Sequence, residues 1–183
     1  MNNKPKIKPV ESNKSKGKTY RVLMAQYKNA MENGYYGEAE LIAYAYIEDR
    51  LKAFLYYSDA LNSRNATSIN ENMSEIMGLQ KGINNISDKI EVIRSAFKAC
   101  NQTKNDNPYV QHLKTVYRVS IDIPEMKSKM KELEKWCAYR NEIIHAVFNK
   151  DMDALHLIYK DHVEKGFSLG RYFDHQVALL ANA

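Results

Sequence analysis

A hydrophobic seam between residues 126 and 147 constrains the fold of this chain more than any other feature. Seven side chains, all but one of them apolar, recur there at alternating spacings of four and three residues. The members of the seam are Met126, Met130, Leu133, Cys137, Arg140, Ile144 and Val147. This spacing places one stripe of side chains on the side of an α-helix that faces a partner helix. We therefore predict a long core helix, with Asp122 as N-cap, Pro124 in the first turn and an end near Asn149.

Most of the remaining chain also carries apolar residues at helical spacing. The further predicted helices cover residues 20–31, 38–61, 87–100, 151–162 and 168–180. The Asn- and Ser-rich stretch before residue 87 is expected to be a mobile loop or a weak helix broken at its glycines, and the segment from 108 to 120 is ambiguous. Because no segment alternates as a strand would, we predict an all-α fold. Its architecture is expected to be an antiparallel bundle of about five to six helices.

The first 18 residues differ in composition from the rest. They contain six lysines and one acid, so this segment carries +5 and the remaining chain is formally neutral. No apolar periodicity is present, and we interpret residues 1–18 as a disordered basic arm and residues 19–183 as one helical domain. Lys14, Lys16 and Lys18 are candidates for contacts with an RNA backbone. A solubilising tail is the other interpretation of this arm.

The composition excludes several classes of protein. With 183 residues, 44% of them hydrophobic, the chain is long enough for one compact domain. No uncharged stretch approaches the ~18 residues of a membrane span, and the lysine-rich start lacks the apolar region of a secretory signal. Cys100 and Cys137 are too few for a disulfide framework, so we expect a cytoplasmic protein. The chain has no glycine-rich phosphate loop, and no cofactor is expected.

Two charged side chains lie in positions where the helical pattern calls for apolar residues. Arg140 belongs to the seam, and Glu48 belongs to an apolar row on the helix predicted over 38–61. A buried guanidinium is costly unless a negative group meets it. We therefore predict that Glu48 and Arg140 pair across the bundle, either to fix the helix register or to support a site.

Arg140 is followed by two polar residues that complete a candidate site. Asn141 and His145 are four residues apart, so they are neighbours on one face of the helix and the amide could orient the imidazole. A permanent cation, an amide and a group that titrates near neutrality are the parts needed for metal-free RNA cleavage. One histidine cannot be acid and base at once, so we expect two copies of the chain to meet in a symmetric homodimer.

The other four histidines show no spacing typical of metal ligands. We expect them at the protein surface and predict no metal site. They are His112, His156, His162 and His175.

The segment from Arg140 to His145, with sequence RNEIIH, resembles the motif of the HEPN superfamily. These small all-α domains carry Arg, four to six further residues and then His, often with Asn directly after the Arg. The resemblance implies a metal-independent endoribonuclease that acts as a dimer, as in toxin–antitoxin, abortive-infection and CRISPR effector nucleases. It implies catalytic roles for Arg140, Asn141 and His145, and an antitoxin or other regulatory protein as a possible partner. Val147 stands where family members silenced by nucleotide transfer carry Tyr, which argues against that mode of control.

Two alternatives belong to other functional classes. The first is a catalytically silent HEPN-like module that binds RNA or a protein partner. The second is an unrelated all-α protein that binds nucleic acid through its basic arm. A cleavage assay in EDTA separates the first alternative from a ribonuclease, and deletion of the arm tests the second.

Overall fold

The computed structural model describes residues 13–102, 105–146 and 152–182, without the side chains of 13–15, 144–146 and 152–155. This part of the chain forms seven α-helices and no strand, apart from one isolated bridge between Ser68 and Gly82. The prediction of an all-α fold is confirmed, with seven helices in place of five to six. The helices are α1 (Asn13–Glu32), α2 (Tyr36–Tyr57), α3 (Glu71–Met77), α4 (Ile86–Cys100), α5 (Pro108–Ser120), α6 (Ile123–Ala146) and α7 (Met152–Ala181).

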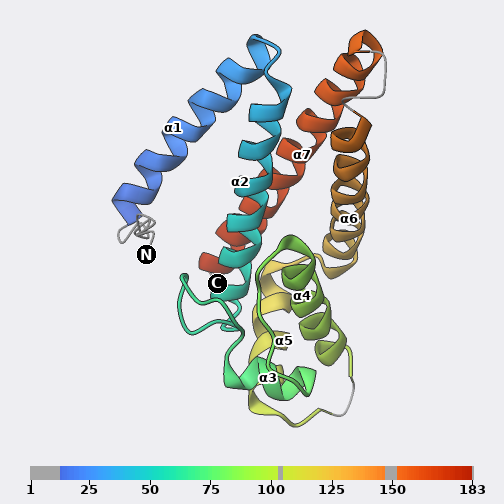
Figure 1. The fold of residues 1–183 in the computed structure, drawn as a ribbon. Coiled ribbons are helices and arrows are strands. Elements are labelled where there is room, and N and C mark those ends of the chain that lie inside the picture. Colours follow the sequence, from blue (N-terminus) through green and yellow to red (C-terminus); the bar gives the residue numbers. More distant parts are fainter. Residues whose placement is uncertain (1–12, 103–104, 147–151, 183) are drawn as a thin grey trace, which may run out of the picture.

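The four long helices lie side by side, and α3, α4 and α5 gather at one end of the molecule (Figure 1). Helix α2 packs against α1, α4 and α7, and α6 packs against α7. Helices α2 and α7 run in the same direction, since Glu40 meets Tyr159 near their starts and Arg50 meets Asp174 further along. The predicted antiparallel arrangement therefore holds for the neighbours α1 and α2 and for α6 and α7, but not for the central pair (Figure 1).

Side-chain caps explain where several helices begin. The Asn85 side chain accepts a hydrogen bond from the Asp88 amide in a capping box that starts α4. Asn107 caps α5 directly before Pro108, so the ambiguous segment from 108 to 120 is a helix. The Asp122 carboxylate accepts a 2.9 Å hydrogen bond from the Glu125 amide, which confirms the predicted start of α6. Its predicted end near Asn149 lies outside the described residues.

Two hydrophobic clusters form the interior. The larger cluster joins the second half of α2 to α4, α5, α6 and the end of α7, with Phe54, Phe97 and Tyr117 at its centre. The smaller cluster joins α1 to the start of α2 and to Val163 of α7. Helix α2 contributes to both clusters, which makes it the central helix of the fold.

Helix α7 is continuous through Gly166, where we predicted a break. A β-carbon at Gly166 would lie 2.4 Å from Trp136 Cζ2, and one at Gly170 would lie 2.5 Å from Tyr46 Cδ1. These glycines allow α6 and α2 to approach α7 closely, and neither has the positive φ of a helix end. Gly166 therefore allows close packing of α6 on α7 and does not end the helix.

One further boundary differs from the predictions. Helix α1 begins at Asn13, so residues 13–18 are helical and only residues 1–12 of the predicted arm remain, outside the described residues. There a polar composition concealed a helix that tertiary contacts stabilise. The polar stretch after α2 contains a short helix, α3, which Asn70 caps and which ends at Gly78 with φ 69°, so it matches the weak helix broken at a glycine that was one of the two alternatives.

Candidate functional site

A buried polar cluster lies where α2, α6 and α7 meet. Its centre is Glu40 on α2, whose side chain is only 2% exposed. The hydroxyl of Tyr159 donates a 2.7 Å hydrogen bond to Glu40 Oε2. Arg140 Nε lies 3.7 Å from the same oxygen, and His162 Nε2 lies 3.2 Å from Glu40 Oε1. One carboxylate therefore links side chains from three helices.

Arg140 is held on two sides. Its side chain is 21% exposed, and its guanidinium lies over the ring of Tyr44, with Cζ 4.8 Å from the ring centroid. An acidic partner and an aromatic face together offset the cost of removing this cation from water. Among the described residues, Arg140 meets a carboxylate only through Nε, and neither Nη atom has a hydrogen bond. The Nε atom is buried, and its contact with Glu40 is an ion pair without a hydrogen bond.

His162 is fixed by the only tryptophan of the chain. The two rings stack with centroids 5.0 Å apart and an interplanar angle of 5°. Trp136 Nε1 also donates a 2.8 Å hydrogen bond to the His162 carbonyl oxygen. The side chain of His162 is only 3% exposed, so our prediction of a surface histidine was wrong. His162 Nε2 faces Glu40 in the interior, without a hydrogen bond between them.

The pKa values of two neighbours limit the chemistry available in the cluster. Burial, followed by the hydrogen bond to Glu40, raises the pKa of Tyr159 well above its ordinary value. Tyr159 therefore remains a hydrogen-bond donor at neutral pH. Burial also raises the pKa of the Cys137 thiol to about 11, although Arg140 acts in the opposite direction. Since the thiolate is the nucleophilic form, Cys137 is not a nucleophile at neutral pH.

Asn141 and His145 follow Arg140 on α6. Asn141 is exposed and makes no hydrogen bond with another described residue. The backbone of His145 belongs to α6, one turn beyond Asn141, but its side chain lies outside the described part of the structure. The candidate catalytic residues thus share the last turns of α6, next to the buried cluster.

The predicted contact between Glu48 and Arg140 was wrong. Glu48 Oε1 instead accepts a 2.9 Å hydrogen bond from Lys89 Nζ on α4. Lys89 is 2% exposed and also donates to the carbonyl oxygens of Ile83 and Asn85, so all three of its protons are used. Arg140 instead forms an ion pair with Glu40, which lies about two turns earlier on α2 than Glu48.

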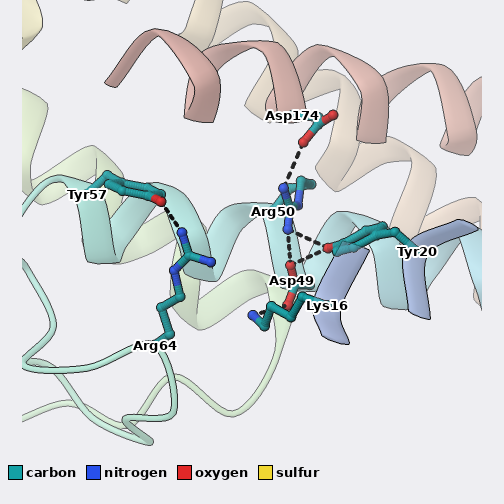
Figure 2. A network of polar contacts seen from close by, with 7 residues as sticks. All are labelled: Lys16, Tyr20, Asp49, Arg50, Tyr57, Arg64 and Asp174. Carbon is teal, nitrogen blue, oxygen red and sulfur yellow. Dashed lines mark hydrogen bonds and ion pairs between the residues drawn. The ribbon is translucent and has the colours of Figure 1, made fainter. Parts of the chain in front are cut away.

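The three lysines assigned to RNA binding have different positions. Lys16 is part of α1, and its Nζ lies 3.4 Å from Asp49 Oδ1. Asp49 also accepts from Tyr20 and Arg50, and Arg50 reaches Asp174 on α7 at 2.7 Å, as Figure 2 shows. Lys18 is exposed on α1, and the side chain of Lys14 lies outside the described residues. Lys16 therefore helps to connect α1 to α2.

The sequence analysis missed Glu40, Tyr159 and His162. Glu40 lies in a row with two fully buried alanines, Ala39 and Ala43, and with Ile47. An acid beside small buried residues could have signalled a close helix contact. Tyr159 and His162 lie one turn apart on α7, but their polar environment depends on Glu40, which is distant in the sequence.

Neither a metal site nor a membrane-spanning helix is found in the described ranges. No group of three or more His, Cys, Asp or Glu side chains there could hold a metal ion. No helix in this part of the chain is both long and apolar enough to cross a membrane.

Comparisons with known proteins add no assignment. The chain matches no protein family model, no curated protein and no solved structure.

Proposed function

We propose that this chain is a metal-independent endoribonuclease of the HEPN type, with a role as a toxin or in phage defence. The observation that carries the proposal is the setting of Arg140. This residue begins an Arg-Asn-x3-His segment, it is anchored by a buried carboxylate and an aromatic face, and its outer edge has no hydrogen bond among the described residues. An ion pair with a purely structural role would not require an Asn-x3-His segment directly after the arginine.

The chemistry follows from the residue types. The ribose 2′-oxygen attacks the adjacent phosphorus, the bond from phosphorus to the 5′-oxygen breaks, and a 2′,3′-cyclic phosphate and a 5′-hydroxyl result. His145 takes the 2′-hydroxyl proton in one protomer, and a second histidine gives a proton to the leaving 5′-oxygen. Arg140 stabilises the negative charge that grows on the phosphoryl oxygens. Asn141 orients the imidazole ring.

The second histidine is best supplied by another copy of the chain. Three exposed apolar side chains belong to the helices that form the cluster: Leu41 (62% exposed), Tyr139 (42%) and Ile158 (45%). They come from α2, α6 and α7, three residues before Tyr44, one before Arg140 and four before His162. An apolar surface beside the candidate catalytic residues supports a two-fold dimer that places both histidines in one composite site.

A cleavage assay with the purified full chain tests the proposal. We expect it to cut single-stranded RNA in EDTA, to leave 2′,3′-cyclic phosphate ends and to spare DNA, which has no 2′-hydroxyl. His145→Ala and Arg140→Ala should each lower the rate about 100-fold or more. Asn141→Ala should have a smaller effect, and His175→Ala, at an exposed position on α7, should have none.

Three outcomes would contradict the proposal. Equal residual cleavage by the wild type and His145→Ala would identify a contaminant and favour a catalytically silent module. Loss of cleavage in EDTA would show a metal-dependent site. Loss of all RNA binding on deletion of residues 1–12, which leaves α1 intact, would favour a protein that works through its basic arm.

A further inference from the structure

A second polar cleft lies at the opposite end of α2 from the Arg140 cluster. It has a volume of about 770 Å³ and is bounded by the end of α2, the loop that follows, and the starts of α3 and α5. Tyr56, at the mouth of the cleft, lies about 24 Å along α2 from Glu40, at 1.5 Å per residue. None of the groups proposed for RNA cleavage belongs to this cleft.

Asp59 and His112 form a contact at the edge of the cleft. Asp59 Oδ2 lies 2.9 Å from His112 Nε2, and the two side chains are 67% and 47% exposed. Asp59 has φ 53°, a left-handed conformation that glycine adopts without strain after a helix end. An exposed pair of this kind contributes little to stability. Aspartate is one of the few residues besides glycine that tolerate this conformation, so the turn places a carboxylate at the edge of the cleft.

The backbone under this pair is rigid. The Tyr109 hydroxyl donates a 3.0 Å hydrogen bond to the Ser58 carbonyl oxygen, and Asn70 Nδ2 donates a 2.5 Å hydrogen bond to the Asp59 carbonyl oxygen. The Ala60 amide also donates to the Leu55 carbonyl oxygen at 2.9 Å. The Asp59 side chain is thus presented to the cleft by a fixed turn.

One wall of the cleft is aromatic, and the Arg64 guanidinium packs on it from a neighbouring pocket. Tyr56 and Tyr57 lie edge to face with their ring centroids 5.3 Å apart. The guanidinium of Arg64 lies over both rings, 4.8 Å from the centroid of Tyr57 and 5.5 Å from that of Tyr56. Figure 2 shows Arg64 reaching Tyr57 from the loop after α2. Tyrosine rings and arginine guanidinium planes are surfaces on which unstacked nucleobases bind.

Two exposed amides complete the cleft. Asn62 and Asn72 line it and have no hydrogen bond with another described residue. An amide both donates and accepts hydrogen bonds, as the edge of a nucleobase does. The Asp59 carboxylate can accept from an exocyclic amino group of a base.

We propose that this cleft binds an unstacked nucleobase, supplied by single-stranded RNA. The base would stack on the Tyr57 wall, and Asp59 and the amides would contact its edge. The choice of RNA as the source rests on the proposed function, whereas the cleft needs no cleavage to bind.

Binding measured without cleavage tests this proposal. The full chain with Arg140→Ala is titrated in EDTA against a fluorescein-labelled 12-nucleotide RNA of mixed sequence, and fluorescence anisotropy gives the Kd. Tyr57→Ala, His112→Ala and Asn72→Ala should each raise the Kd, with a rise of about fivefold or more for Tyr57→Ala. His112 and Asn72 are exposed, so their variants are informative even if Tyr57→Ala fails to fold. Tyr35→Ala and His175→Ala, exposed and outside the cleft, should change the Kd less than about twofold.

Competitors distinguish the source of the ligand. Competition by millimolar AMP or CMP would support a site for a single nucleotide, and variant effects without such competition would support a site for a strand. Competition by maltohexaose, no RNA binding at all, or cleft variants that bind as the parent does would each overturn the proposal. Cleft variants that lose binding in a chain that never cleaves RNA would support the cleft and contradict the ribonuclease. Cleavage by a chain whose cleft variants bind RNA as the parent does would support the ribonuclease and contradict the cleft.

Discussion

Glu40 accepts a hydrogen bond from Tyr159 of α7 and forms an ion pair with Arg140 of α6, so its replacement tests how the cluster is held together. In Glu40→Gln, the amide keeps one oxygen for Tyr159 but presents no negative charge to Arg140. We expect a loss of about 1–3 kcal/mol in the free energy of unfolding, because a buried polar group is left poorly satisfied. Urea denaturation measures this loss. Glu38→Gln, on the exposed side of the same helix, should change the value by less than ~0.5 kcal/mol.

The same variant separates positioning from simple stability. If Glu40 positions Arg140 for cleavage, Glu40→Gln should lower kcat more than it changes KM, at a temperature where the protein remains folded. A destabilised variant with normal kcat would show that Glu40 is structural only.

Residue patterns indicated that Arg140 needs an acid, but they selected Glu48 where the structure has Glu40. The row that contains Leu41, Tyr44 and Glu48 was interpreted as the buried face of its helix, yet Leu41 is 62% exposed. Helix α2 is covered by α1 on one side and by α7 on another, so apolar residues occur around most of its circumference. Periodicity then cannot show which side faces α6. Only the packed structure distinguishes Glu40 from Glu48.

At the scale of whole helices, the close contact of α7 with its neighbours depends on glycine. In Gly166→Ala, the new methyl group would overlap the Trp136 ring, at 2.4 Å from Cζ2. We expect a loss of about 1–3 kcal/mol from overpacking, partly offset by the better helix propensity of alanine. Gly17→Ala in α1 meets no atom within 4 Å, so it should be neutral or stabilise by up to about 1 kcal/mol.

Thermal unfolding compares the two glycine variants, and the intrinsic fluorescence of Trp136 adds a local readout. This residue is the only tryptophan, so a change in its emission reports on the contact between α6 and α7. Equal stabilities and identical emission for both variants would contradict the close approach at Gly166.

Helix boundaries that a local cap sets were easier to predict than boundaries that depend on packing. Asp122 caps α6 through a local contact that a short sequence pattern encodes, and the prediction was confirmed. Gly166 carries the same local signal as a helix end, but it lies inside α7 because a tryptophan from α6 occupies its open side. Helix α3 matches the weak helix that was one of the two alternatives for its stretch, because Asn70 caps its start and Gly78 ends it.

At the scale of the whole molecule, the parallel pair α2 and α7 brings the start of α2 beside Tyr159 and His162, next to the end of α6. In an up-and-down antiparallel bundle, the start of α2 and the start of α7 would lie at opposite ends. The parallel arrangement therefore creates the junction that holds Arg140. The proposed ribonuclease site and the Asp59 cleft lie at opposite ends of α2. Their separation allows one RNA strand to contact both.

The apolar surface around Arg140 leads to a prediction about assembly. We expect a two-fold homodimer, because each protomer supplies one candidate proton-transfer group while cleavage needs two. Leu41→Glu and Ile158→Glu place a charge on this surface and should shift the protein toward a monomer and lower cleavage about 10-fold or more at the same protein concentration. Leu179→Glu, at an exposed apolar position near the other end of α7, should leave both properties unchanged. Light scattering coupled to size-exclusion chromatography measures the mass. A wild type that remains monomeric at high concentration with full activity would contradict the dimer, and the single chain would then have to supply both proton-transfer groups itself.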